Sequence, residues 1–169
     1  EMRGYPTLTV MLAVNVADPG MVRAACYNES SDGLYVSPNA IYLSQAEYTA
    51  EEEYKTLLHR FSISAGLDYS GSGKVDGHLS GGSNADFRVN EFQGDLRVVT
   101  TKWTGVEGDR WDHQLFVLRK SPTALELATV ATLPNATYPE SIGKPDEDLY
   151  GVRFLGTKAY LVTFERIDP

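Results

Sequence analysis

Three aspartates recur at matching places in this sequence, each directly before a short apolar run. They are Asp32, Asp86 and Asp148, and each lies 12 to 15 residues before the hydroxyl residue that closes a repeated segment. Carboxylates that a repeating fold gathers near an axis attract a hard cation such as calcium, which takes about six to eight oxygen ligands. The alternative, which surface statistics favour, is that they are solvated aspartates in turns. We therefore predict no obligatory cofactor and keep calcium as a candidate ligand.

Three aromatic residues form a second group of candidates. Trp103, Trp111 and Tyr138 lie in stretches that the pattern of apolar residues assigns to the longer loops. Exposed rings there could stack on a sugar or a peptide, whereas rings that fill the space between sheets would only stabilise the fold. Packing is the favoured interpretation, and the three remain candidate ligand-binding residues beside the aspartates.

Patterns that would indicate catalysis are weak. His59, His78 and His113 do not show the short recurring spacings of zinc sites. Ser70 and Ser72 stand among glycines without the GxSxG spacing of a nucleophile elbow. We predict no catalytic residues and a structural role for each histidine.

Composition limits the class of partner. The chain has 169 residues and a formal net charge of −8, which allows one domain with a core and argues against binding to nucleic acid or anionic membranes. No apolar run approaches the roughly 18 residues of a membrane span, and the first residues lack the features of a signal peptide. The single cysteine, Cys26, is expected to be a small buried side chain.

The elements that must position these residues are short apolar runs that recur along the chain. Three of them follow a turn residue and close on Ser or Thr: PNAIYLS (38–44), QGDLRVVT (93–100) and LGTKAYLVT (155–163). Such repeats, separated by other strand-like runs, predict a radial array of small sheets, the β-propeller. Residues 41–43 and 159–162 are apolar on both faces, as in a strand buried between two neighbouring sheets.

The predicted fold is all-β, a partial β-propeller of antiparallel four-stranded blades, with two complete blades flanked by half-blades. We place outer strands at 8–27, one blade at 33–79, a second at 86–133 and inner strands at 149–164, within a single domain. Gly66, Gly71 and Gly73 indicate a loop inside the first blade. Residues 45–58 have a helix-forming composition, which we interpret as a polar excursion at a blade edge.

The division into half-blades has a consequence for assembly. Propellers usually have about four to eight blades, so a chain of this size is expected to be a fragment of a larger propeller. Alternatively, two copies could exchange their half-blades, close a six-bladed ring and hide the open sheet edges. A homodimer by strand exchange is therefore one predicted assembly.

Several segments resemble a known family. They are HRFSISAGLDYSGSGKVDGHL, DFRVNEFQGDLRVVTT and, with the most specific pattern, DLYGVRFLGTKAYLVTFERIDP. They resemble the secreted bacterial and archaeal proteins that carry a C-terminal β-propeller domain distantly related to WD40 repeats. The resemblance covers nearly the whole chain and implies an extracytoplasmic location, with no established activity. It brings no catalytic residues, because matching positions such as Phe154, Gly156 and Tyr160 are fold residues, and the acidic Glu51-Glu52-Glu53 departs from the pattern.

Ligands of propellers usually bind the loops that enter the innermost strands. Here those loops are residues 28–32, 80–86 and 134–148. We predict a non-catalytic binding or scaffolding domain outside the cytoplasm, with a protein or glycan partner at these loops. The alternative is a metal-dependent hydrolase with its site at the propeller axis.

Overall fold

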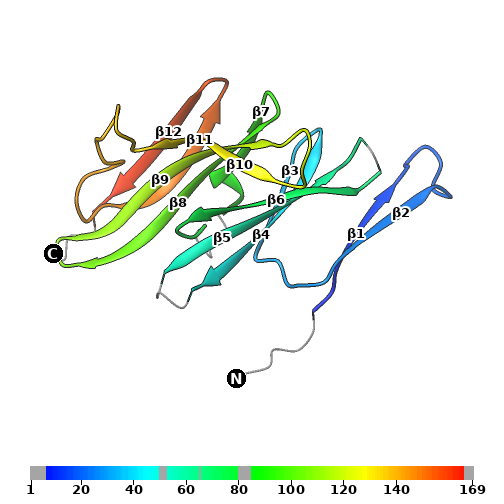
Figure 1. The fold of residues 1–169 in the computed structure, drawn as a ribbon, viewed down its shortest axis with the longest axis horizontal. Helices are drawn as coiled ribbons and strands as arrows, with labels where there is room; N and C mark the ends of the chain where they lie inside the picture. Colours follow the sequence, from blue (N-terminus) through cyan, green and yellow to red (C-terminus); the bar gives the residue numbers. More distant parts are fainter. Residues whose placement is uncertain (1–6, 50–52, 65, 80–84, 166–169) are drawn as a thin grey trace.

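The computed structural model of the protein describes residues 7–49, 53–64, 66–79 and 85–165. Within these ranges the chain forms twelve strands and one 3-10 turn, with no α-helix (Figure 1). The strands are β1 (Thr9–Val14), β2 (Val22–Tyr27), β3 (Gly33–Val36), β4 (Ala40–Tyr48), β5 (Tyr54–Ser62), β6 (Asp68–Asp76), β7 (Val89–Phe92), β8 (Asp95–Val106), β9 (Asp109–Lys120), β10 (Leu127–Leu133), β11 (Asp148–Leu155) and β12 (Lys158–Phe164), and the 3-10 turn is η1 (Ala85–Arg88). The described part of the chain holds no helix that is long and apolar enough to span a membrane.

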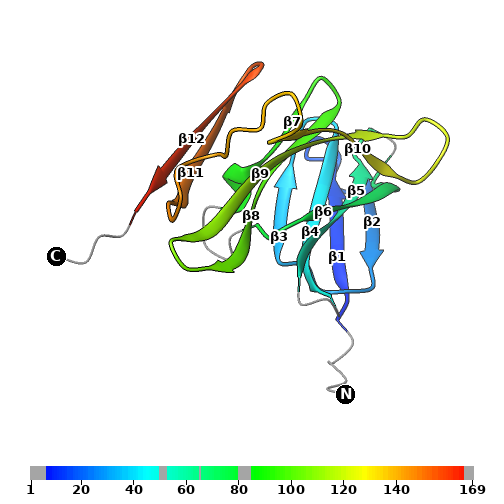
Figure 2. The ribbon, with the colours of Figure 1, turned by 60° about the vertical axis from the view of Figure 1, so that its left-hand side comes forward.

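The strands form four antiparallel sheets whose order follows the chain. Two sheets have four strands, in the orders β3-β4-β5-β6 and β7-β8-β9-β10, and two are the hairpins β1-β2 and β11-β12. Figures 1 and 2 show the sheets in succession, from the N-terminal hairpin to the C-terminal hairpin. This arrangement confirms the predicted all-β fold, with two complete blades flanked by half-blades.

Turn chemistry explains why the strands double back as tight hairpins. The β7–β8 turn consists of Gln93 and Gly94, whose φ angles are 53° and 86°. Two successive residues with positive φ form a type I′ turn, whose twist matches that of the flanking strands. Glycine takes this conformation without strain, and so the QGD sequence fixes the register of the hairpin.

Three hydrophobic clusters join the four sheets in series. The largest lies between the two four-stranded sheets and includes Leu58 and Leu118, both fully buried. Met11 packs the β1–β2 hairpin against the first four-stranded sheet, and Val99 and Val152 join the second to β11–β12. Since burial of a large apolar side chain contributes about 1.5–3 kcal/mol, packing between sheet faces is the main source of stability.

The middle of strands β4 and β8 is buried on both faces. Tyr42 and Leu43 are adjacent in β4, point to opposite faces and are both buried. Val98 and Val99 occupy the same arrangement in β8 and are completely inaccessible to solvent. For β4 this is the burial that its apolar pattern predicts.

Strand β12 departs from that prediction. Leu161 packs into the cluster shared with β8, but Tyr160 and Val162 on the other face are 51% and 56% exposed. The reason is that no sheet follows β12 within the described residues, so only one face of the hairpin is covered.

The β1–β2 hairpin also has one face that no other sheet of the described chain covers. Cys26 lies on this hairpin and is exposed, so the expectation that it is buried is wrong. Val10, Leu12 and Val14 alternate along one face of β1 and are all exposed. Cys26 lies opposite Val10 in the pairing of β1 with β2 and is also exposed. Its thiol therefore belongs to an open apolar face rather than to the core.

A second correction concerns the glycines of the first blade, since Gly71 and Gly73 lie inside β6 and not in a loop. A Cβ on Gly73 would lie 2.5 Å from the carbonyl oxygen of Leu127, and one on Gly71 would lie 2.8 Å from the backbone nitrogen of Glu126. These glycines let the start of β10 cross close to β6, where Ser72 and Glu126 form a parallel bridge. The absence of side chains is therefore a packing requirement.

Within the segment of helix-forming composition, residues 45–48 form the end of β4 and residues 54–58 the start of β5. The two strands pair over nine positions, from Ala40 with Ser62 to Tyr48 with Tyr54, and this pairing overrides local helix propensity. Glu51 and Glu52 lie outside the described residues, as do residues 80–84 of the predicted second loop and the last four residues of the resemblance motif.

Candidate ligand-binding cavity

A cavity of about 610 Å³ lies between residues of the two four-stranded sheets. Asp32 lines it from directly before β3, Ala46 from β4 and Tyr54 from the start of β5. His78 and Leu79, which follow β6, lie on the same cavity, and Trp103 and Trp111 close it from β8 and β9. Because neighbouring strands are antiparallel, the start of β3, the end of β4 and the start of β5 fall at one end of their sheet.

Aromatic rings dominate the lining. Trp103 and Trp111 are a cross-strand pair with ring centroids 4.9 Å apart and planes at 71°. The Tyr54 ring makes an edge-to-face contact with His78, with centroids 5.6 Å apart, and a tilted contact with Tyr48, with centroids 4.9 Å apart. Trp103 is 50% exposed, so this indole is not the blade filler that the packing interpretation expects.

The hairpin that carries the two tryptophans is longer than the sequence pattern indicates. The prediction placed Trp103 and Trp111 in loops, but β8 and β9 continue to Val106 and from Asp109. The strands persist because polar pairs such as Lys102 with Asp112 continue the ladder beyond the apolar run. Rings on paired strands are held more rigidly than rings on loops, which favours a preorganised site.

A buried polar chain fixes the base of this hairpin. His113, 1% exposed, has Nε2 2.9 Å from the carbonyl oxygen of Glu147 and Nδ1 3.0 Å from the hydroxyl of Thr101. The carbonyl can only accept, so we assign the proton to Nε2, with Nδ1 accepting from Thr101. Arg88 donates to the Thr101 hydroxyl and to the carbonyl oxygen of Leu149, each at 2.9 Å. Burial lowers the pKa of His113, which is consistent with a neutral ring.

Thr101 also positions the part of the cavity that follows β6. Its backbone nitrogen donates to the His78 carbonyl oxygen at 3.0 Å, and its carbonyl oxygen accepts from His78 at 2.9 Å. This isolated antiparallel bridge attaches His78 and Leu79 to the edge of β8. One residue of the second sheet thus anchors cavity residues that belong to the first blade.

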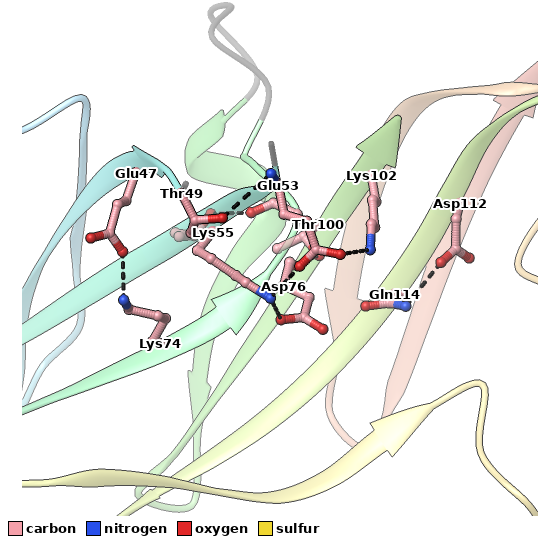
Figure 3. Close-up of polar contacts among 12 residues, drawn as sticks. Glu47, Thr49, Glu53, Lys55, Lys74, Asp76, Thr100, Lys102, Asp112 and Gln114 are labelled. Carbon is pink, nitrogen blue, oxygen red and sulfur yellow. Dashed lines mark hydrogen bonds and ion pairs between the residues drawn. The ribbon is translucent and has the colours of Figure 1, made fainter. Parts of the chain in front are cut away.

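Charged side chains on the strands that carry cavity residues are paired with one another (Figure 3). Glu53 contacts Lys55 at 2.9 Å and Lys102 at 2.8 Å, and Lys55 also contacts Asp76 at 2.7 Å. Hydrogen bonds from Lys102 and Lys55, with their positive charges, lower the pKa of Glu53 to about 2. The carboxylate therefore stays ionised and holds both lysines beside β5 and β8.

The structure brings together three of the six predicted ligand-binding residues. Asp32, Trp103 and Trp111 line the cavity, whereas Tyr138 and Asp148 do not. Tyr138 lies in the connection between β10 and β11 and is exposed, with its backbone bonded to Asn135. Asp86 belongs to η1, but its side chain lies outside what the structure describes.

Two residues that the sequence did not single out as ligands, Tyr54 and His78, complete the aromatic lining. The sequence did hold a signal for Tyr54. It directly follows the acidic stretch Glu51-Glu52-Glu53, and an aromatic residue next to such a stretch is expected at the end of a strand. His78 had no such local signal, since its bridge to Thr101 joins residues that are far apart in the sequence.

The predicted calcium ligands have local hydrogen-bond partners. Asp32 Oδ2 accepts from the Ala46 backbone nitrogen at 2.7 Å, and Asp148 Oδ1 accepts from Leu149 at 2.7 Å. Among the described residues, no group of three or more His, Cys, Asp or Glu side chains is arranged to hold a metal ion. Calcium binding by these aspartates stays a prediction.

The successive antiparallel sheets define the chain as part of a β-propeller. The family model for the β-propeller domain matches residues 2–169, and the chain belongs to this family. It is 34% identical over 98 residues to an uncharacterized protein of Methanocaldococcus jannaschii, an overlap that covers 58% of this chain and 13% of that protein. No solved structure shows a significant match. The relation to WD40 repeats and the secreted location stay predictions.

Proposed function

We propose that the domain is a non-catalytic binding module that takes its ligand in the cavity beside Asp32, Trp103 and Trp111. The observation that carries the proposal is the half-exposed indole of Trp103, held on a paired strand over a cavity of about 610 Å³. Binding sites for small groups typically measure about 300–1,000 Å³, with aromatic and apolar walls and a few polar atoms. The cavity has that size and that composition.

The energetic reason is the apolar surface that the exposed rings leave in water. A ligand that covered about 100 Å² of ring surface would gain roughly 2.5 kcal/mol from that burial. Since the tryptophans lie on paired strands, little conformational entropy would be lost on binding. A single ring or side chain of a protein or glycan partner fits this site better than a broad flat surface does.

The chemistry of the lining supports binding rather than turnover. Among the described residues, the lining holds no Ser, Thr, Cys or Lys; its titratable side chains are Asp32, Tyr54 and His78, and one oxygen of Asp32 is engaged by Ala46. We place this role outside the cytoplasm because of the resemblance to secreted propeller proteins. Fractionation of cells that express the native gene tests the location.

Intrinsic fluorescence tests the binding site directly. Trp103 and Trp111 are the only tryptophans of the chain, and both line the cavity. We expect a ligand from a set of short peptides and oligosaccharides to change their emission in a saturable way. The variant Trp103→Ala should lower the affinity at least tenfold, because it removes the exposed ring of the pair.

Tyr138→Ala is the matched control, since Tyr138 is equally aromatic and exposed but lies away from the cavity. It should leave the affinity unchanged. Full affinity in Trp103→Ala, measured by calorimetry with a ligand that binds the unaltered protein, would contradict the proposal.

A further inference from the structure

We propose that the cavity selects an organic cation, namely an ammonium group such as that of a lysine side chain or a quaternary amine. The inference rests on the proposed function, because it assigns a class of ligand to the same cavity. Three features of the site carry it: the faces of the aromatic rings, the charge of the lining, and the pairing of the surrounding cations.

The rings supply the first part of the site. The face of an aromatic ring carries partial negative charge, and among the side chains indole attracts a cation most strongly. Two indoles and the phenol of Tyr54 border one space here. The Trp103 and Trp111 planes are inclined at 71° with the edge of one indole against the face of the other, so the pair forms an angled corner instead of a flat platform. A rounded ammonium group fills a corner better than a flat sugar ring does.

Asp32 supplies the second part. Within the part of the chain that the structure describes, it is the one carboxylate of the cavity lining, and no Lys or Arg lines the cavity there. Ala46 occupies Oδ2 through its backbone N–H, at 2.7 Å, and so fixes the direction of the carboxylate. A carboxylate has about four acceptor positions, so Asp32 keeps the capacity to accept from a bound ammonium group.

The nearby cations do not cancel this preference, because each is held by an acidic partner. Lys102 precedes Trp103 in the sequence and is bound to Glu53 at 2.8 Å. Arg110 precedes Trp111 and makes two contacts with Asp146, at 2.5 and 2.7 Å. These pairs leave the charge of Asp32 uncompensated, and the net charge of −8 attracts cations at longer range.

An anion fits poorly, since the described residues of the lining offer it neither Lys nor Arg. A neutral sugar could stack on the same rings without using the charge of Asp32. The experiment must therefore separate charge from shape.

A pair of probes with nearly the same shape makes that separation. Choline carries a trimethylammonium group, and 3,3-dimethyl-1-butanol replaces this group by an uncharged tert-butyl group. In titrations followed by tryptophan fluorescence and calorimetry, we expect choline to bind at least tenfold more tightly than the neutral alcohol. Added salt should weaken choline binding and leave alcohol binding unchanged.

Asp32→Asn tests the carboxylate, because asparagine keeps an oxygen for the Ala46 hydrogen bond and removes the charge. We expect choline affinity to fall roughly fivefold to tenfold, with no change for the alcohol. Asp148→Asn is the matched control. Leu149 pairs with Thr163 as Gly33 pairs with Ser44, so Asp148 occupies the place before β11 that Asp32 occupies before β3. Asp148 does not line the cavity. It should leave both affinities unchanged, and thermal unfolding checks that each variant is folded.

The outcomes distinguish the two proposals. Equal affinity for choline and the alcohol, or tighter binding of a neutral oligosaccharide, overturns cation selection while the cavity stays the binding site. Choline binding that Asp32→Asn and Trp103→Ala leave unaltered overturns it as well. If no cation, peptide or sugar perturbs the tryptophans, the proposed function itself fails.

Discussion

The middle of the molecule and its two ends use the same apolar strand pattern with opposite results. In β4 and β8, adjacent apolar residues on both faces are buried because a sheet lies on either side. In β1 and β12, one face packs inward while Leu12 and Val162 on the other remain in water. A two-sided apolar pattern therefore predicts that two neighbours are needed, but does not guarantee that one chain supplies both.

The comparison also explains where the cavity lies. Its tryptophans extend from β8 and β9, and its other residues lie in the strands of the first four-stranded sheet or directly beside their ends. The middle of β8 is packed on both faces, so the exposed ring of Trp103 extends from a strand that is fixed at its base. A site built on such a strand can keep an exposed ring in a fixed geometry.

The largest expected effect compares two leucines. Leu118→Ala should lower the free energy of unfolding by about 2–5 kcal/mol, because Leu118 is fully buried between the two four-stranded sheets. Leu12→Ala should change it by less than about 0.5 kcal/mol, since Leu12 is 63% exposed on the uncovered face of β1. Urea denaturation at low protein concentration measures both.

A large loss in Leu12→Ala would contradict this contrast and show that the β1 face is covered in solution. The predicted strand-exchange dimer would cover it, because β1–β2 of one chain and β11–β12 of the other would form one blade, and the four-stranded sheet that packs on β11–β12 would then lie next to the open face of β1. In that case the loss should depend on protein concentration, and light scattering should give twice the chain mass. A strict monomer in light scattering would eliminate the dimer.

A smaller effect compares two glycines. Gly73→Ala should cost about 1–3 kcal/mol, because its Cβ would approach Leu127 of β10 within 2.5 Å and the Leu118 side chain within 2.9 Å. Gly151→Ala is the control in β11, where an added Cβ meets nothing within 4 Å. We expect its unfolding free energy to be unchanged or raised by up to about 1 kcal/mol. Equal effects of the two substitutions would argue against close crossing of β10 over β6.

These glycines mark the limit of what the sequence could predict about the fold. Strand β3 begins at Gly33, where the predicted blade 33–79 begins, and β10 ends at Leu133, where the predicted blade 86–133 ends, because alternation and turn residues are local signals. Gly71 and Gly73 were misassigned to a loop, since their role depends on a strand more than fifty residues later in the chain. Contacts between sheets are not encoded within a window around either glycine.

The candidate site shows the same contrast between local signals, which the sequence carries, and contacts between distant segments, which it does not. Asp32, Trp103 and Trp111 could be proposed from residue type and from their place near strand ends. That they share one cavity could not, because the relevant β8–β9 extension depends on polar cross-strand pairs, and His78 reaches the cavity through its bridge to Thr101. The sequence thus indicated individual ligand candidates, and the packing of two sheets determined which of them meet.

The smallest expected effect compares two histidines at the interfaces between the four-stranded sheets and the flanking hairpins. His113 lies at the interface with β11–β12, and His59, whose Nε2 is 2.8 Å from the Tyr27 hydroxyl, lies at the interface with β1–β2. Burial lowers the pKa of both rings in the folded protein. Between the unfolded value of about 6.5 and the lower folded values, the unfolded chain binds more protons, and stability must fall as the pH falls. The full contribution is present above about pH 6.5.

Urea midpoints between pH 8 and pH 5 measure this dependence, with at most about 1.4 kcal/mol lost for each unit by which a folded pKa is lowered. His113→Gln should flatten the curve, because glutamine can donate to the Glu147 carbonyl and accept from Thr101 without titrating. His59→Gln removes the corresponding term at the more open interface, and the double variant should be nearly flat over this range. If stability still falls with pH to the same extent in the double variant, the two histidines do not cause the pH dependence. Burial at the two interfaces would then make no difference to the protonation of His59 and His113 on folding.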